Sequence, residues 1–195
     1  TDKAQRKMLT AITGGIGSGK TFVSRLLRQR GIEIFDCDAS AKRLMRSDQQ
    51  LQRQLTAVVG EEVFPGGVLD KALLSRFIVA SDSNAQQIDE VVHPAVALDF
   101  LASGCQWLES AILFESGFVA RIPFDYVVCV TAPFEVRLAR VMERDGISRE
   151  KALEWIRRQM PQDEKARRAD FVIVNDGSAD LDEQIEKMLQ QIKTK

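Results

Sequence analysis

The chain is poor in the residues that build disulfide frameworks and metal sites. It has three cysteines and one histidine among 195 residues. Cys37, Cys105 and Cys129 are odd in number, lie far apart and form no CxxC pair, so neither a disulfide framework nor a zinc site is indicated. The single histidine, His93, cannot build a metal site alone. A reducing cytoplasm is the expected location.

The chain also lacks a charge imbalance and long apolar runs. Its 27 basic and 28 acidic residues give a net charge of −1, which argues against a general binder of nucleic acid or of membrane surfaces. No apolar run approaches the roughly 20 residues that span a bilayer, and the polar segment Thr1–Lys7 has no signal-peptide core. We therefore expect no nucleic-acid or membrane partner, and no protein partner is implied.

One segment that is present has a specific chemical meaning. It reads Gly14-Gly15-Ile16-Gly17-Ser18-Gly19-Lys20-Thr21 and matches the P-loop pattern G-x-x-x-x-G-K-[ST] without a mismatch. An apolar strand pattern precedes it over residues 9–13, and a helical pattern follows it. The alternative is a flexible glycine turn that matches by chance, but the strand and the helix on either side favour nucleotide binding.

The P-loop pattern assigns chemistry to particular groups. Residues without side chains let consecutive backbone N–H groups surround phosphate oxygens, and the helix N-terminus adds partial positive charge. Lys20 would reach the β- and γ-phosphates of ATP, and the Thr21 hydroxyl would ligate Mg²⁺.

Strand-like and helix-like segments alternate along the rest of the chain. Apolar strands are expected near residues 32–35, 105–109, 126–130 and 171–174. Residues 39–101 are mostly helical with a break at 65–67, residues 134–169 are helical with breaks at 145–146 and 161, and a C-terminal helix carries one apolar stripe. This order predicts an α/β fold with a doubly wound, mostly parallel sheet, an inserted helical subdomain and a helical lid.

Four acidic residues are candidates for chemistry at the carboxyl ends of strands. Asp36 and Asp38 follow the second strand, where a carboxylate could take the proton of an acceptor hydroxyl or position magnesium through water. The alternative is that one of the two only caps the next helix. Glu109 and Glu115 could act as Walker-B-type carboxylates, or they could be solvated or capping glutamates.

Three arginines share one face of the helix expected after residue 133. Arg137, Arg140 and Arg144 are spaced by three and four residues, and their guanidinium groups suit phosphate oxygens. Spacing alone favours the alternative, a solvated face paired with Glu135 and Glu143.

The full set of motifs resembles the dephospho-coenzyme A kinase family, from about Leu9 to Leu181. Besides the P-loop, the resemblance rests on segments in the family's order: 35–39 (FDCDA), 65–70 (PGGVLD), 93–94 (HP), 112–115 (ILFE), 137–146 with Gln159, and 169–175 (ADFVIVN). Two positions depart from the family pattern. Thr21-Phe22 replaces Ser-Thr after the P-loop lysine, which keeps the hydroxyl, and Ala111 replaces a proline before 112–115.

The resemblance implies ATP- and Mg²⁺-dependent phosphorylation of the ribose 3′-hydroxyl of dephospho-coenzyme A. It implies a single P-loop kinase domain over residues 8–195 that comprises a core sheet (8–38, 105–133 and 170–195), a helical acceptor subdomain (39–104) and a lid (134–169). The small-molecule partners would be ATP and dephospho-coenzyme A.

The resemblance also assigns roles to residues. Asp38, Lys20 and Arg140 are the expected catalytic residues, and Asp36, Asp38 and His93 the expected acceptor-binding ones. Without the resemblance, a packing or capping role for His93 is favoured. The expected ATP-binding residues are Gly15, Ile16, Gly17, Ser18, Gly19, Lys20, Thr21, Arg140, Arg144 and Asn175. Thr21 is the expected metal ligand, with Asp36 or Glu109 acting through water.

Two other functions remain open at this point. One is a different compact P-loop kinase that acts on a nucleoside monophosphate or a polyol. The other is a nucleotide-binding switch, although the chain lacks the guanine-reading N-K-x-D element of a GTPase.

Overall fold

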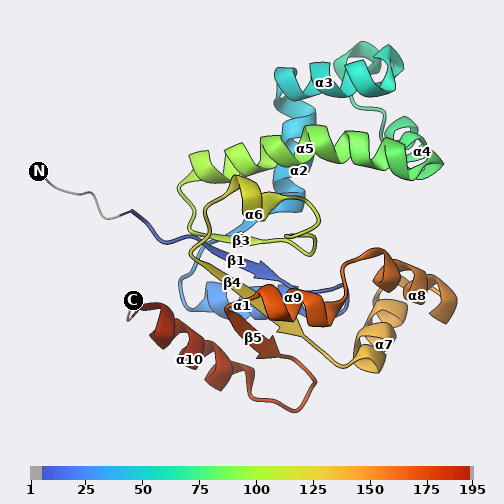
Figure 1. Ribbon diagram of the computed structural model, residues 1–195. Helices are drawn as coiled ribbons and strands as arrows, with labels where there is room; N and C mark the ends of the chain where they lie inside the picture. The colour runs from blue at the N-terminus through green and yellow to red at the C-terminus, as the bar shows by residue number, and fades with distance from the viewer. Residues whose placement is uncertain (1–5, 194–195) are drawn as a thin grey trace, which may run out of the picture. The chain divides into compact units, whose positions relative to one another are not determined.

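The computed structural model describes residues 6–193 (Figure 1). The chain divides into two compact units. The sheet unit holds the chain up to Phe35, Cys105–Glu115 and the chain from Pro123 onward, and the helical unit holds Asp36–Gly104 and Ser116–Ile122. The expectation for Thr1–Lys7 lies mostly outside the described residues.

The sheet has the predicted five strands: β1 (Thr10–Thr13), β2 (Ile34–Asp36), β3 (Trp107–Glu109), β4 (Tyr126–Thr131) and β5 (Phe171–Val174). Their spatial order is β2-β3-β1-β4-β5, and β1 pairs in parallel with β3 and β4, as β4 does with β5. The register sets Ile12 opposite Glu109 and Thr13 opposite Cys129. Because neighbouring strands are parallel, the loops that leave β1, β3, β4 and β5 start from one edge of the sheet, as the doubly wound fold requires.

Five longer helices belong to the sheet unit: α1 (Lys20–Gln29), α7 (Phe134–Asp145), α8 (Arg149–Arg158), α9 (Gln162–Arg168) and α10 (Leu181–Lys193). Gly146 takes a left-handed conformation that ends α7, and Pro161 precedes α9, so both predicted breaks are confirmed. The segment expected as a lid is therefore part of the same compact unit as the sheet.

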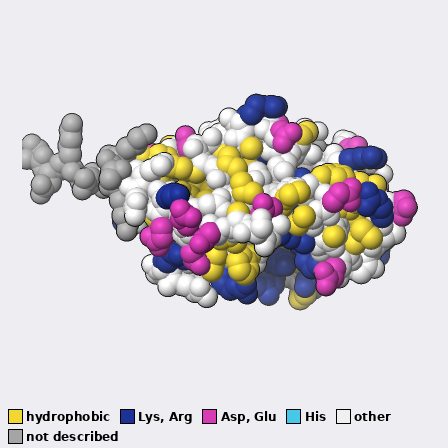
Figure 2. All heavy atoms as spheres, turned by 90° about the horizontal axis from the view of Figure 1, so that it is seen from below, with side chains coloured by type: hydrophobic (Ala, Val, Ile, Leu, Met, Phe, Trp, Pro, Cys, Tyr) yellow, Lys and Arg dark blue, Asp and Glu magenta, His cyan; other side chains and the backbone are white. Residues whose placement is uncertain are grey.

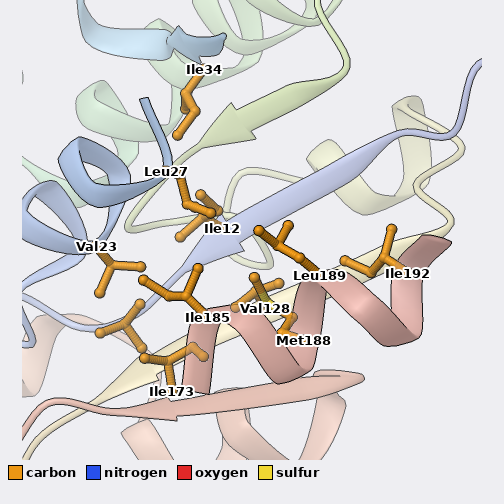
Figure 3. Packing of buried hydrophobic residues seen from close by; sticks show 11 residues of the cluster. Ile12, Val23, Leu27, Ile34, Val128, Ile173, Ile185, Met188, Leu189 and Ile192 are labelled. Carbon is orange, nitrogen blue, oxygen red and sulfur yellow. The ribbon is translucent and has the colours of Figure 1, made fainter. Parts of the chain in front are cut away.

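A buried apolar cluster joins the sheet to α1 and α10 (Figure 3). Ile12, Val128 and Ile173 come from the strands, and the predicted stripe of α10 supplies Ile185, Met188, Leu189 and Ile192. Each fully buried side chain of this size stabilises the fold by about 1.5–3 kcal/mol relative to an exposed one. This packing holds β1, and with it the start of the P-loop, in place.

The helical unit contains α2 (Cys37–Ser47), α3 (Gln49–Val59), the 3₁₀ turns η1 (Glu61–Val63) and η2 (Pro65–Gly67), α4 (Lys71–Ala80), α5 (Asp82–Ser103) and α6 (Phe118–Arg121). Asp36, Asp48, Asp70 and Ser81 cap α2, α3, α4 and α5, each by accepting a backbone N–H bond three residues ahead. α6 packs against α5, so residues 116–122 fall in this unit and not with the sheet. None of the described helices is long and apolar enough to cross a membrane.

Candidate active site

The P-loop connects β1 to α1 and depends on glycine at its crowded points. Gly17 has φ +79°, and a Cβ there would lie 2.5 Å from the backbone oxygen of Arg137. Gly19 has φ +89°, and a Cβ there would lie 2.1 Å from Asn175 Nδ2. Both positions exclude any side chain, because the left-handed backbone and the close neighbours each penalise one.

Gly19 is also the N-cap of α1, and among the described residues no side chain caps this helix. The first backbone N–H groups of a helix lack partners inside it, and together with the helix dipole they form an anion site. The exposed Thr21 hydroxyl lies in the same first turn. This geometry supports the phosphate cradle expected from the sequence.

The ammonium group of Lys20 is largely desolvated at this site. Burial lowers its pKa from the ordinary 10.5 to about 8; Glu109 opposes the shift, while Lys165, Arg144 and Arg137 add to it. Several cations therefore act on one place in a chain of almost zero net charge. In Figure 2, several Lys and Arg side chains lie close together on the face shown. A polyphosphate bound beside Lys20 would favour the charged form of that lysine.

Two of the three α7 arginines contact the P-loop itself. Arg137 is buried and donates from Nε to the Ile16 carbonyl oxygen at 3.1 Å. Arg140 donates to the carbonyl oxygens of Gly17 at 3.2 Å, of Ser18 at 3.4 Å and of Asn175 at 3.0 Å. The solvated-face alternative is therefore wrong for both.

The remaining partners on this face differ from those expected. Arg144 is largely exposed and pairs with Asp145 at 2.7 Å, so its surroundings fit the solvated alternative, though not with Glu143. Glu135 pairs with Arg149 instead of an α7 arginine. Arg137 is absent from the ATP-binding residues that the resemblance implies, and its spacing to Arg140 is equally typical of a surface helix.

Asn175 directly follows β5, and its side chain is hydrogen-bonded to the P-loop. Its Nδ2 donates to the Ser18 carbonyl oxygen at 3.1 Å, and its backbone N–H donates to Thr131 at 2.7 Å. The contact brings together two segments 157 residues apart. Its expected place beside the adenine stays a prediction.

Both glutamates near β3 have a side-chain partner, although Glu115 is an exposed residue. Glu109 accepts a hydrogen bond from the Ser24 hydroxyl at 2.7 Å. Glu115 pairs at 2.9 Å with the fully buried Lys165 of α9, whose Nζ also donates to the Ala111 carbonyl oxygen at 2.5 Å. Sequence patterns missed Lys165, because it lies in a charged helical segment where lysine is normally exposed.

Three expected acceptor residues lie in the helical unit. Asp36 accepts the Ala39 N–H at 3.0 Å and so caps α2, which is the capping role considered for one member of the aspartate pair. Asp38 is exposed in the first turn of α2 and has no side-chain hydrogen bond or ion pair within the described chain. Their acceptor roles stay predictions.

His93 lies inside α5, before Pro94, in a half-buried setting. Its Nε2 is 3.5 Å from Asp89 Oδ1, and its ring lies 5.5 Å from that of Phe118 on α6. Burial lowers the pKa of His93, with Asp89 opposing the shift and Arg121 adding to it. The imidazole beside Phe118 of α6 is therefore neutral at neutral pH, and its acceptor-binding role stays a prediction.

Comparison with known proteins identifies the family. The model of the dephospho-CoA kinase family matches residues 8–181. The chain belongs to the dephospho-CoA kinase family.

Members of this family from distant organisms resemble the chain over most of its length. A dephospho-CoA kinase from Bacteroides fragilis is 41% identical over 189 residues, covering 91% of this chain and 89% of the relative. One from Thermus thermophilus is 36% identical and covers 97% and 94%. A crystal structure from Thermus thermophilus superimposes with a TM-score of 0.80 at 34% identity, over 96% of this chain and 98% of that one. The sheet and the P-loop of this chain are thus those of a dephospho-CoA kinase.

The fold extends beyond the family. A shikimate kinase from Acinetobacter baumannii superimposes with a TM-score of 0.54 at 18% identity, which relates the two folds alone. A shared fold does not specify the substrate, so this likeness concerns the fold only.

Proposed function

We propose that this dephospho-CoA kinase transfers the γ-phosphoryl group of ATP to the ribose 3′-hydroxyl of dephospho-coenzyme A. The products are coenzyme A and ADP, and the reaction is the last step of coenzyme A synthesis. The observation that carries the proposal is the family match over residues 8–181. Within this range, the uncapped start of α1, Lys20 and two α7 arginines lie at one loop.

On the nucleotide side, the P-loop N–H groups and the Lys20 ammonium hold the β- and γ-phosphates. Gly15, Ile16, Gly17, Ser18 and Gly19 supply the loop, and Arg140 and Arg144 add charge beside it. As the bond between the γ-phosphoryl group and ADP breaks, negative charge develops on the bridging oxygen. Fixed cations beside that oxygen therefore stabilise the transition state.

The oxygen donors at this site suit Mg²⁺. Thr21 offers an exposed hydroxyl in the first turn of α1, and the Glu109 carboxylate acts electrostatically on Lys20. Within the described residues no three His, Cys, Asp or Glu side chains cluster to hold a metal. Thr21 would hold the ion, with Glu109 or Asp36 through water, and the bound ion would neutralise phosphate charge.

On the acceptor side, Asp38 is the proposed base for the ribose hydroxyl. Asp36 is engaged as the cap of α2, whereas Asp38 is exposed and unpaired in the described chain, so its carboxylate is available for a proton. Asp36 and His93 would orient the acceptor. A cytoplasmic location is part of the proposal, supported by the few, scattered cysteines.

The proposal is tested by product analysis and one pair of variants. Purified protein with ATP, Mg²⁺ and dephospho-coenzyme A should yield a 3′-phosphate, detected by mass spectrometry and phosphorus NMR. Asp38→Asn should keep ATP affinity and reduce kcat by about 10²–10⁴-fold, the usual contribution of a general base. Asp36→Asn is the matched control, because asparagine also caps a helix, and it should keep the stability of α2.

Two outcomes would count against the proposal. If a nucleoside monophosphate or a polyol is phosphorylated while dephospho-coenzyme A is not, the chain is a different P-loop kinase. If Asp38→Asn turns over at nearly the wild-type rate, another group takes the proton.

A further inference from the structure

Ile16 is held on three sides by the helices that follow β4. Its backbone N–H donates to Gln159 Oε1 at 2.8 Å, and its carbonyl oxygen accepts from Arg137 Nε at 3.1 Å. Its side chain packs against a buried cluster made by α7 and α8: Leu138, Val141, Ala152 and Ile156. A residue in the middle of the P-loop is thus hydrogen-bonded to a segment more than 120 residues away in the chain.

The contacts from α7, α8 and Asn175 use only some of the backbone polar groups of the loop. Arg140 and Asn175 also bind loop carbonyl oxygens, those of Gly17 and Ser18. These bonds go to backbone groups at positions 16–18, while the Ser18 N–H is used inside the loop, where it donates to the Gly15 carbonyl oxygen at 3.1 Å. Within the described chain, the backbone N–H groups of Gly17, Gly19 and Lys20 have no hydrogen-bond partner, so they can bind a ligand.

Gln159 accepts the hydrogen bond from the Ile16 N–H, the one loop N–H that these helices bind. It is the C-cap residue of α8, with an extended backbone, and its own N–H donates to Ile156 at 3.3 Å. The side chain is therefore anchored at the base and presents its carbonyl oxygen to Ile16. An amide that ends a helix and also binds a distant loop transmits the position of that helix to the loop.

We propose that Gln159 is a positioning residue for triphosphate binding, which acts by fixing the Ile16 peptide and so aligning the loop N–H groups that follow it. We call the hydrogen bond between the Ile16 N–H and Gln159 Oε1 the latch. The inference rests on the proposed nucleotide binding and adds to it that the α8 end sets the affinity for the β- and γ-phosphates. AMP, which lacks these two phosphates, does not use the latch.

The test compares ATP and AMP binding in three variants. Gln159→Leu keeps the size of the side chain and removes the acceptor oxygen, so calorimetry should show ATP affinity falling about tenfold or more, the usual effect of a buried donor left unpaired. AMP affinity should change less than twofold. Gln159→Glu keeps an acceptor oxygen, so amide hydrogen exchange should show protection of the Ile16 N–H retained in Gln159→Glu and lost in Gln159→Leu.

Gln162→Leu is the matched control. Gln162 clamps the backbone of Ala132 with two bonds, at 3.0 and 2.9 Å, and has no bond to the P-loop in the described chain. Its loss should lower stability without a selective loss of ATP affinity.

The latch is overturned if Gln159→Leu leaves ATP affinity intact, if it weakens ATP and AMP equally, or if Gln162→Leu produces the same selective loss. A wild-type protein that binds AMP but not ATP would overturn the proposed function as well. A wild-type protein that binds ATP while its latch variant is unchanged would overturn the latch alone.

Discussion

At the scale of single residues, Lys20 places function and stability in opposition. Its burial lowers the pKa to about 8, so below pH 8 the nucleotide-free protein holds a charge that water would solvate better. The folded state releases this proton before the unfolded state does. The free energy of unfolding that Lys20 contributes therefore rises with pH between 8 and 10.5.

Lys20→Met should then stabilise the free protein and weaken ATP binding. The shift from 10.5 to about 8 corresponds to at most about 3 kcal/mol of added stability at pH 7. The gain should shrink above pH 8 and vanish near 10.5. Urea unfolding at pH 7 and pH 10 measures it, with the exposed Lys187→Met as control. Equal stability of Lys20→Met and wild type at pH 7 would contradict the prediction.

Motif residues and packing residues differ in how far the sequence predicts them. Lys20 and Thr21 follow from the P-loop pattern, because a cradle for phosphate needs those groups at that spacing. Lys165 does not, since only the packed chain shows that α9 carries its ammonium group to the Glu115 carboxylate. Removing Glu115 would leave the fully buried Lys165 ammonium without its ion-pair partner, whereas removing Lys165 would leave a partly exposed carboxylate. The loss of Glu115 is therefore the more costly of these two changes.

At the scale of elements, the P-loop and α7 are fitted to each other at Gly15. A Cβ added there would lie 2.1 Å from Arg137 Nη2, the far end of a flexible side chain, and Gly15 is not in the left-handed region. At Gly17 the obstacle is the backbone oxygen of Arg137, which no substitution of that side chain removes. The two glycines are therefore needed for different reasons.

A double-mutant cycle separates these reasons. Gly15→Ala should destabilise the wild type and be tolerated in an Arg137→Ala background, with a coupling of about 1–2 kcal/mol, within the range for contacting residues. Gly17→Ala should destabilise both backgrounds equally. Chemical unfolding of the six proteins measures the free energies, and additivity at Gly15 would show that the two residues do not compete for space.

The same elements show where sequence periodicity stops being informative. The spacing of Arg137, Arg140 and Arg144 predicts a shared helix face, which is confirmed, but it favoured solvent on that face. Carbonyl oxygens of a loop more than 120 residues earlier decide the matter for the first two. Strands and breaks were predictable, because β-branched runs, glycine and proline act locally.

At the scale of the whole molecule, the residues proposed for the nucleotide and those proposed for the acceptor belong to different compact units. The P-loop, Lys20 and the α7 arginines belong to the sheet unit, whereas Asp38 and His93 belong to the helical unit. The order of motifs predicted this division, because a helical stretch interrupts the strands. The motifs place residues 116–122 with the core sheet (105–133), whereas the structure places them in the helical unit, because the short helix α6 packs against α5.

Substitutions of His93 should therefore affect the acceptor and spare ATP. His93→Gln removes the imidazole and should raise the KM for dephospho-coenzyme A about tenfold, the cost of one hydrogen bond or less. The KM for ATP should stay within twofold. His93→Phe keeps an aromatic ring against Phe118 and so separates packing from polar contact. Steady-state kinetics with each substrate varied in turn measures both constants. If His93→Phe restores the acceptor KM, the residue only packs; if it fails to, while thermal unfolding is unchanged, an imidazole nitrogen contacts the acceptor.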